Sequence, residues 1–326
     1  MNRWIVFGAA TGFVFGLAAL AAPDGFASQV QASAPSLWYR FNESPSSTTI
    51  VNHGSLGAPY NATPFSGVLL NQPTASGDSG VGFNAATQPY IESNSTVPAA
   101  LLGNPTFSVE AIVRMDGLAS TWAPMLFWGG NTTGTSAWFS LRNNDWDILY
   151  AGFYNTGLRT VQRIQKNTWY HLVWTRNSAG GINDSMTGTA YYINGNPVAM
   201  TQDELLLGPL VPAITSSKFR IQKAGNFTRF FSGTLDELAL YQRVLSPSEV
   251  LSHASAVGCP NCTGDLNHDC LVEDSDFVIF AAAYNLLVCD DPAMPEGCPS
   301  DFNHDGTVDD SDFVLFIGAY NTLLCE

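Results

Sequence analysis

The stretch FSVEAIVRM (residues 107–115) carries the clearest structural signal in the chain. Its apolar residues recur at every second position, Phe107, Val109, Ala111 and Val113. That is the period of a β-strand with one face toward a core. Similar runs follow at WYHLVWTR (169–176) and TAYYINGNPVAM (189–200). In the last run Asn194-Gly195 favours a tight hairpin turn, because that pair tolerates positive φ. Short strands without helical periods predict an antiparallel β-sandwich.

The order of these and neighbouring segments resembles the laminin-G-like, concanavalin A-like jellyroll family. The matching pieces are LWYRFNES (37–44), VGFNAATQPYIES (81–93), FSVEAIVR (107–114), WYHLVWTR (169–176), AYYINGNPV (190–198) and FFSGTLDELALYQRVLSPSEVLSHA (230–254). The resemblance implies a jellyroll β-sandwich over residues 35–256. A capping box, Ser246 to Glu249 with Pro247 at the first helical position, predicts a short closing helix. This family contains binding, adhesion and hydrolytic proteins alike.

The N-terminus has the residue pattern of a targeting signal. Arg3 precedes an uncharged apolar run, Trp4–Ala22, and small residues follow. This pattern predicts a signal peptide over residues 1–27, cut before Ser28, and a membrane anchor is the alternative. No later segment approaches the ~18 apolar residues of a membrane span. The low charged fraction of 13% also suits a secreted protein. We expect an extracellular or cell-surface location, with no membrane span after signal removal.

The C-terminal segment, residues 259–326, differs sharply in composition. It holds 14 of the 28 Asp and Glu residues and no Lys or Arg. Nucleic acid is therefore excluded as a partner, because phosphate contacts need a basic surface. All six cysteines also lie there: Cys259, Cys262, Cys270, Cys289, Cys298 and Cys325. In a small secreted module they predict three disulfides. A symmetric pairing joins Cys289 to Cys298, Cys262 to Cys325 and Cys259 to Cys270, and zinc at Cys259 and Cys262 is an alternative.

The same segment repeats a twelve-residue string, DLNHDCLVEDSD (265–276) and DFNHDGTVDDSD (301–312). Oxygen ligands recur at the alternate positions that a calcium loop uses. The predicted ligands of two calcium ions are Asp265, Asn267, Asp269, the Leu271 carbonyl, Glu273 and Asp276, then Asp301, Asn303, Asp305, the Thr307 carbonyl, Asp309 and Asp312. Gly306 supplies the sharp turn at position six, where the first loop has Cys270. Apolar residues, Val272 and Val308, stand where two loops would pack together.

Each loop is followed by a run with helical period. The apolar positions are Phe277, Phe280, Tyr284 and Leu287 in the first and Phe313, Phe316, Tyr320 and Leu323 in the second. A loop-helix unit repeated twice, without an entering helix, resembles the dockerin type I module. The resemblance implies a calcium-ordered helix pair that docks onto a cohesin-like or cell-surface partner. The positions that read the partner would be Asp274, Ser275, Ala281 and Ala282, with Asp310, Ser311, Ile317 and Gly318 in the second copy.

Aromatic residues crowd the interval 122–154 of the sandwich. Trp138, Trp146 and Tyr154 are the candidates for a ligand-binding surface, and packing in the core is the alternative for most aromatics there. Some members of the jellyroll family bind calcium in the sandwich, but Asn42 and Asn52 replace the usual acids.

The sequence favours a non-catalytic protein. It lacks the E-x-D-x-x-E string of jellyroll glycanases, and its closest acidic clusters are Asp145-Trp146-Asp147 and Asp236-Glu237. We therefore expect a secreted binding or adhesion protein whose sandwich recognises a glycan or a protein. The alternatives are a polysaccharide hydrolase with a dockerin-like tail and a structural matrix component.

Overall fold

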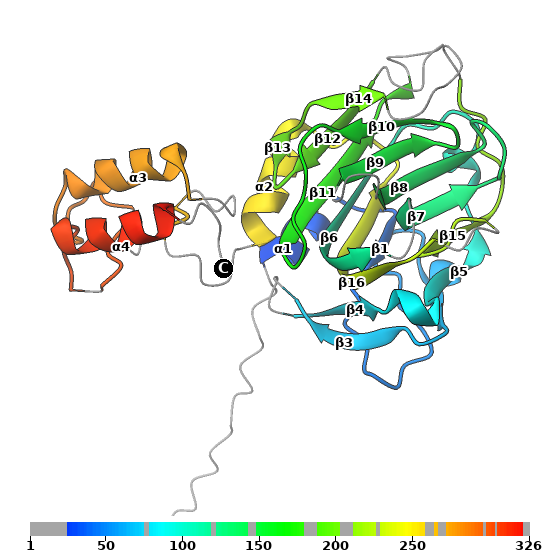
Figure 1. The fold of residues 1–326 in the computed structure, drawn as a ribbon, viewed down its shortest axis with the longest axis horizontal. Coiled ribbons are helices and arrows are strands. Elements are labelled where there is room, and N and C mark those ends of the chain that lie inside the picture. The colour runs from blue at the N-terminus through cyan, green and yellow to red at the C-terminus, as the bar shows by residue number, and fades with distance from the viewer. Residues whose placement is uncertain are drawn as a thin grey trace, which may run out of the picture.

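A computed structural model describes residues 25–74, 78–118, 122–142, 148–178, 188–202, 211–225, 229–257, 264–266, 272–295, 298–303 and 305–321. Its main part is a mainly β, antiparallel sandwich of two sheets (Figure 1). The first sheet has the order β13 (Asn196–Pro197), β12 (Thr189–Ile193), β11 (Trp169–Arg176), β6 (Phe107–Leu118), β16 (Phe231–Tyr241), β4 (Ser79–Phe83) and β3 (Leu69–Pro73), with β1 (Leu37–Tyr39) paired to β16.

The second sheet has the order β14 (Met200–Gln202), β10 (Thr156–Thr160), β9 (Ile148–Phe153), β8 (Ser136–Arg142), β7 (Ala123–Gly129), β15 (Lys218–Ile221), β5 (Tyr90–Thr96) and β2 (Ala62–Phe65). Three short 3-10 turns connect strands: η1 (Ala58–Tyr60), η2 (Ala85–Thr87) and η3 (Ala99–Leu101). The expected jellyroll sandwich is confirmed.

The main core lies between the two sheets, and the period of FSVEAIVRM accounts for it. On β6 the predicted inward residues Phe107, Val109, Ala111 and Val113 are all buried in this core. Ile112 points to the opposite face of the first sheet and packs in a separate apolar cluster. Strand β11 pairs with β6 in antiparallel register, with Leu172 opposite Ala111.

Two helices cover the outer face of the first sheet. Helix α1 (Gly25–Ala32) and helix α2 (Pro247–Val257) lie side by side (Figure 1). Phe26 and Val30 of α1 are fully buried against Ile112 and Val173 of the sheet. Helix α2 is the closing helix that the capping box predicted, with Ser246 and Glu249 hydrogen-bonded as expected. Helix α1 was not expected, and it extends the sandwich unit upstream of residue 35.

The C-terminal segment forms a helix pair, α3 (Asp274–Tyr284) and α4 (Asp310–Tyr320) (Figure 1). Phe280 and Phe316 stack between the helices with ring centroids 5.0 Å apart. Val272 and Val308 are fully buried in the same cluster, as their loop position predicted. The predicted apolar face is only partly correct, since Phe277, Phe313 and Leu287 are 42%, 37% and 53% exposed. Leu287 lies beyond the end of α3, and Leu323 lies outside the described residues.

One predicted disulfide is present: Cys289 and Cys298 are bonded. The other four cysteines lie outside the described residues, so their pairing stays a prediction. Within the described part of the chain, no helix is long and apolar enough to cross a membrane.

Candidate functional site

An aromatic pocket lies on the outer face of the second sheet. Residues of β7, β8 and β9 alternate between the sandwich core and this face. Leu126, Phe139 and Ala151 point to the core. Phe127, Trp138 and Tyr150 point away from it and form a separate cluster with Ala224. These three side chains are nevertheless buried, because Trp122 and Tyr154 pack over them.

The pocket is open to solvent and has a volume of about 100 Å³. Its described lining consists of Trp122, Trp138, Tyr150, Tyr154, Asn155 and Arg229. The Trp138 and Tyr154 rings lie 6.1 Å apart, and the Trp122 and Tyr150 rings 6.4 Å apart. A cavity that accepts one water needs only ~10–15 Å³, so this pocket has room for a larger group.

Hydrogen bonds hold part of the lining in place. The Trp138 indole N–H donates to Ser136 Oγ at 2.8 Å, and Asn155 Nδ2 donates to Thr133 Oγ1 at 3.1 Å. Gly157 on β10 leaves space for the Tyr150 ring, since a Cβ there would lie 2.2 Å from Cζ of that ring. The aromatic side chains are therefore pre-positioned.

Two arginines flank Trp122. The guanidinium carbon of Arg142 lies 5.0 Å from the ring centroid, and that of Arg229 lies 4.9 Å from it. Such cation–π contacts orient both charges beside the pocket. Trp122 Nε1 is buried and finds no hydrogen-bond partner among the described residues. This edge of the pocket therefore retains unused polar capacity.

The structure brings two of the three predicted ligand-binding residues together, Trp138 and Tyr154. Trp146 lies outside the described residues, as do Asp145 and Asp147. Trp128 and Phe153 are core residues, as the alternative interpretation expected. Tyr150, Asn155 and Arg229 were missed. Gly157, which leaves room for the Tyr150 ring from the neighbouring strand, is the sequence signal that could have pointed to Tyr150.

The Asp236-Glu237 pair serves the structure of the sandwich. A β-bulge lies between Asp236 and Ala239, and Glu237 adopts a φ of 49°. Glu237 accepts hydrogen bonds from Trp38 Nε1 at 2.5 Å and Arg40 Nε at 2.8 Å. Burial raises the pKa of Glu237 to about 8, although the Arg40 guanidinium favours the ionised form.

Oxygens of Asp78, Asp236 and Glu237 lie within 4.8 Å of one another. Arg40 pairs with Asp78 at 3.1 Å as well as with Glu237, so a guanidinium supplies positive charge here. Asn42 donates to Asp78, and Asn52 accepts hydrogen bonds from the backbone of Trp38 and Gly54. The two asparagines thus bond to protein groups.

Glu110 anchors a second buried polar cluster, beneath α1 and α2. Its carboxylate lies 2.8 Å from His171 Nε2 and 3.0 Å from His253 Nδ1, and it accepts a hydrogen bond from the Tyr241 hydroxyl. His253 Nε2 lies 2.9 Å from Ser33 Oγ. Burial favours the neutral carboxyl, but the positive charge of His253 and bonds to both histidines outweigh burial and lower the pKa of Glu110.

This Ser-His-Glu order was not predicted from sequence. His171 was expected on a strand face, and it lies there on β11. Glu110 is fully buried and is shared by two histidines and a tyrosine. The cluster therefore links strands β6, β11 and β16 to helix α2 and, through Ser33, to the end of helix α1. This role is structural.

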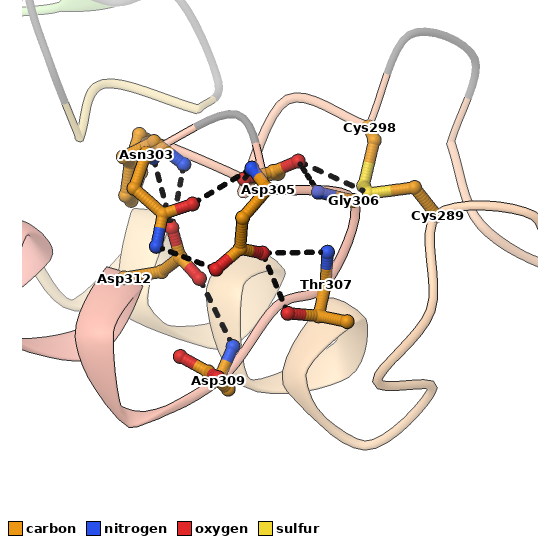
Figure 2. The surroundings of a disulfide bond; sticks show 10 residues. Cys289, Cys298, Asn303, Asp305, Gly306, Thr307, Asp309 and Asp312 are labelled. Atoms are coloured by element: carbon orange, nitrogen blue, oxygen red, sulfur yellow. Dashed lines mark hydrogen bonds between the residues drawn. A yellow bond between two sulfur atoms is a disulfide. The ribbon is translucent and has the colours of Figure 1, made fainter.

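The second twelve-residue loop is described except for His304 (Figure 2). Asp301 accepts hydrogen bonds from the backbone of Asp305 and Gly306. Asp312 is fully buried and accepts from the backbone of Phe302, Asn303 and Asp309. Asp305 accepts from Thr307, and this bonding lowers the pKa of Asp305.

In the first loop Asp265, Glu273 and Asp276 are described, whereas Asn267, Asp269, Cys270 and Leu271 are not. Asp265 and Asp276 are buried like their counterparts Asp301 and Asp312. Glu273 and Asp276 form a capping box at α3, and Asp309 and Asp312 form one at α4. Positions 9 and 12 of both loops therefore also begin the helices.

The oxygen donors in both loops are of the type that calcium prefers. Four of these carboxylates are buried in a segment without Lys or Arg, which fits a bound cation. Among the described loop residues, however, no three carboxylates have oxygens within 4.8 Å of one another. Calcium therefore stays a proposal.

Two of the predicted partner-reading residues, Asp274 and Asp310, accept reciprocal hydrogen bonds between the two helices. The Tyr320 hydroxyl of α4 donates to Asp274 of α3, and the Tyr284 hydroxyl of α3 donates to Asp310 of α4. Ser275, Ala282, Ser311 and Gly318 are exposed, whereas Ala281 and Ile317 are half-buried. The repeat is thus a pseudo-symmetric pair in space.

Two solved structures are similar to part of this chain. Domain 4 of AbnA, a GH43 extracellular arabinanase from Geobacillus stearothermophilus, in complex with arabinotriose, is 19% identical, with a TM-score of 0.46 over 68% of this chain and 98% of that one. Trypanosoma rangeli sialidase in complex with sialic acid is 15% identical, with a TM-score of 0.44, and the match covers 69% of this chain but only 33% of the sialidase. The likeness concerns the fold alone.

Sequence comparison supports the same fold. No curated protein matches the chain significantly. Residues 85–251, just over half of the chain, match the family model Laminin_G_3, which is described as the concanavalin A-like lectin/glucanases superfamily. The chain therefore belongs to the concanavalin A-like lectin/glucanases superfamily.

Proposed function

We propose that this protein is a secreted, non-catalytic binding protein whose sandwich recognises a glycan in the aromatic pocket. The observation that carries the proposal is the outward cluster of Trp138, Tyr150 and Tyr154 around an open pocket. Aromatic rings stack on the apolar faces of sugar rings, and a few polar groups at the edge fix orientation. Asn155 and Arg229 supply such groups.

The described lining of the pocket supports binding rather than hydrolysis. It contains no carboxylate, whereas glycoside hydrolysis usually needs two, ~5–10 Å apart. Glu110 and Glu237 are fully buried and engaged in hydrogen bonds. A hydrolase is the alternative, and Asp145 and Asp147 outside the described residues are its candidates.

The C-terminal module is proposed to be a tether. Two calcium ions would bind the loops at 265–276 and 301–312 and neutralise the buried carboxylates. The ordered helix pair would then dock onto a cohesin-like or cell-surface protein. Support comes from the donor set and from the exposed apolar residues Phe277, Val278, Phe313 and Val314 on α3 and α4.

The pocket is tested with the full chain on a glycan array that includes arabinan, galactan, glucan and uronan oligosaccharides. We expect at least one class to bind. Tyr154→Ala should weaken that binding about tenfold, which corresponds to ~1.4 kcal/mol. Trp169→Ala is the control, because it removes a half-buried tryptophan from the first sheet, where Arg114 stacks on it.

Three outcomes would overturn the proposal. One is the absence of binding to every class, which would favour a structural role. Another is equal loss of affinity in the two variants. The third is release of new reducing ends from the bound oligosaccharide, which would make the protein a hydrolase.

A further inference from the structure

We infer that the sugar bound in the aromatic pocket is acidic and carries a carboxylate, as a uronic acid does. This inference rests on the proposed glycan function and adds a ligand class to it. The reason lies in the balance of donors and acceptors at the edge of the pocket around Trp122.

Donors predominate at that edge. Trp122 Nε1 is a buried donor with no acceptor among the described residues. Indole offers a donor only, and a guanidinium offers five donors and no acceptor. Arg229 lines the pocket, and the guanidinium groups of Arg229 and Arg142 both lie over the Trp122 ring. A ligand that satisfies the Trp122 indole has to bring an acceptor oxygen.

The described charges at this edge are positive. Both guanidinium carbons lie within 5.0 Å of the Trp122 ring centroid, and the described lining of the pocket contains no carboxylate. Both arginines also make other interactions within the protein, so the inference rests on their position at the pocket. A carboxylate matches the planar fork of Arg229 and forms charge-assisted hydrogen bonds that a neutral hydroxyl does not.

The rest of the pocket suits the remainder of such a sugar. The half-buried Tyr154 ring, which packs 6.1 Å from the buried Trp138 ring, offers an apolar surface for the sugar ring. Asn155 bonds to Thr133 through its nitrogen and keeps its amide oxygen for a sugar hydroxyl. One end of the pocket is thus apolar and the other is cationic.

The test measures binding of oligomers of galacturonate, glucuronate and mannuronate to the full chain by calorimetry. Each oligomer is compared with its carboxyl-reduced neutral counterpart, which keeps the same sugar skeleton. We expect at least one acidic oligomer to bind at least tenfold more tightly than its neutral partner. That difference should shrink as salt rises, because exposed charge pairs are screened.

Variants locate the effect. Arg229→Gln should remove the preference for the acid, and Arg229→Lys should keep part of it, because lysine retains the charge but not the fork. Arg163→Gln is the matched control: it removes the same charge from an exposed residue outside the described lining. Thermal unfolding of each variant checks that the fold is intact.

The outcomes separate this inference from the proposed function. Equal binding of acidic and neutral oligomers would overturn the inference and leave glycan binding in place. Equal losses in Arg229→Gln and Arg163→Gln would also overturn it. Absence of binding to every oligosaccharide, neutral ones included, would overturn both.

Discussion

Glu110 shows how one residue can connect distant parts of this chain. Its carboxylate is fully buried on β6, yet it bonds to side chains from β11, β16 and α2. The positive charge of His253 and hydrogen bonds to both histidines compensate for the loss of water. Through His253 and Ser33 the same network reaches the residue after helix α1.

This network predicts a pH dependence of stability. Burial alone lowers the pKa of His253, but the charge of Glu110 outweighs burial and raises it. The stability that His253 contributes is therefore complete below its unfolded pKa of about 6.5 and is lost as pH rises through the folded value. The pKa of Glu110 is lowered, so its contribution is complete above about 4.5 and is lost in acid.

We expect His253→Gln to destabilise the sandwich most between about pH 4.5 and 6.5, and less at pH 8. The measurement is the melting temperature of the parent and the variant across this range. A penalty that stays the same from pH 5 to pH 8 would show that folding does not raise the pKa of His253.

A second prediction concerns the floor of the pocket. A methyl group on Gly157 would lie 2.2 Å from the Tyr150 ring, so Gly157→Ala should push that ring into the pocket. We expect weaker glycan binding and a loss of ~1–3 kcal/mol in unfolding free energy. Gly117→Ala is the control, because its Cβ would meet nothing within 4 Å. Unchanged binding in Gly157→Ala would exclude Tyr150 from the site.

At the scale of elements, helix α1 completes the sandwich. Phe26 is fully buried and contacts the rings of His171 and His253 edge-on. The cut expected before Ser28 would remove Phe26 and Ala27 from this cluster. We therefore expect any signal cleavage to fall before Gly25.

The prediction for α1 has two parts. The intact mass of the secreted protein should include Phe26, and a mature chain that begins at Ser28 would contradict this. Phe26→Ala should lower the unfolding free energy by ~3–5 kcal/mol, as expected for a buried phenylalanine. Val51→Ala, at a 40% exposed position, should cost far less.

The repeated loops form the second element with a testable property. If each loop holds one calcium ion, Asp265→Ala and Asp301→Ala should each reduce the stoichiometry from two ions to one. Calorimetric titration of the full chain with calcium measures this directly. Asp290→Ala is the control, since Asp290 is an exposed acid outside both loops. Two ions in both loop variants would refute the ligand assignment.

The whole molecule contains separate apolar cores. The sandwich buries one cluster between its sheets and another beneath α1 and α2, and the helix pair buries its own around Phe280 and Phe316. Among the described residues, none belongs to both the sandwich clusters and the helix-pair cluster. We expect chelation of calcium to lower the melting temperature of the helix pair alone, because a ligand stabilises only the unit that binds it.

Much of this organisation was readable from the sequence alone. The two-residue period of FSVEAIVRM determined which side of β6 is buried, because side chains on a strand alternate. The repeat at 265 and 301 predicted two helices and the burial of Val272 and Val308. The symmetry of the repeat suggested a cysteine pairing that includes the Cys289–Cys298 disulfide, which the structure contains. All of these depend on local period or on internal symmetry.

Only the tertiary structure decided which distant residues meet. The pocket joins Trp122 and Trp138 to Tyr154 and Arg229, and the buried cluster joins Ser33 and Glu110 to His253. The two-residue period shows which side chains of a strand point outward. It does not show whether an outward side chain meets water, a helix or a side chain of another strand. Strand register and the packing of α1 and α2 settle that question, because they are set by contacts between segments far apart in sequence.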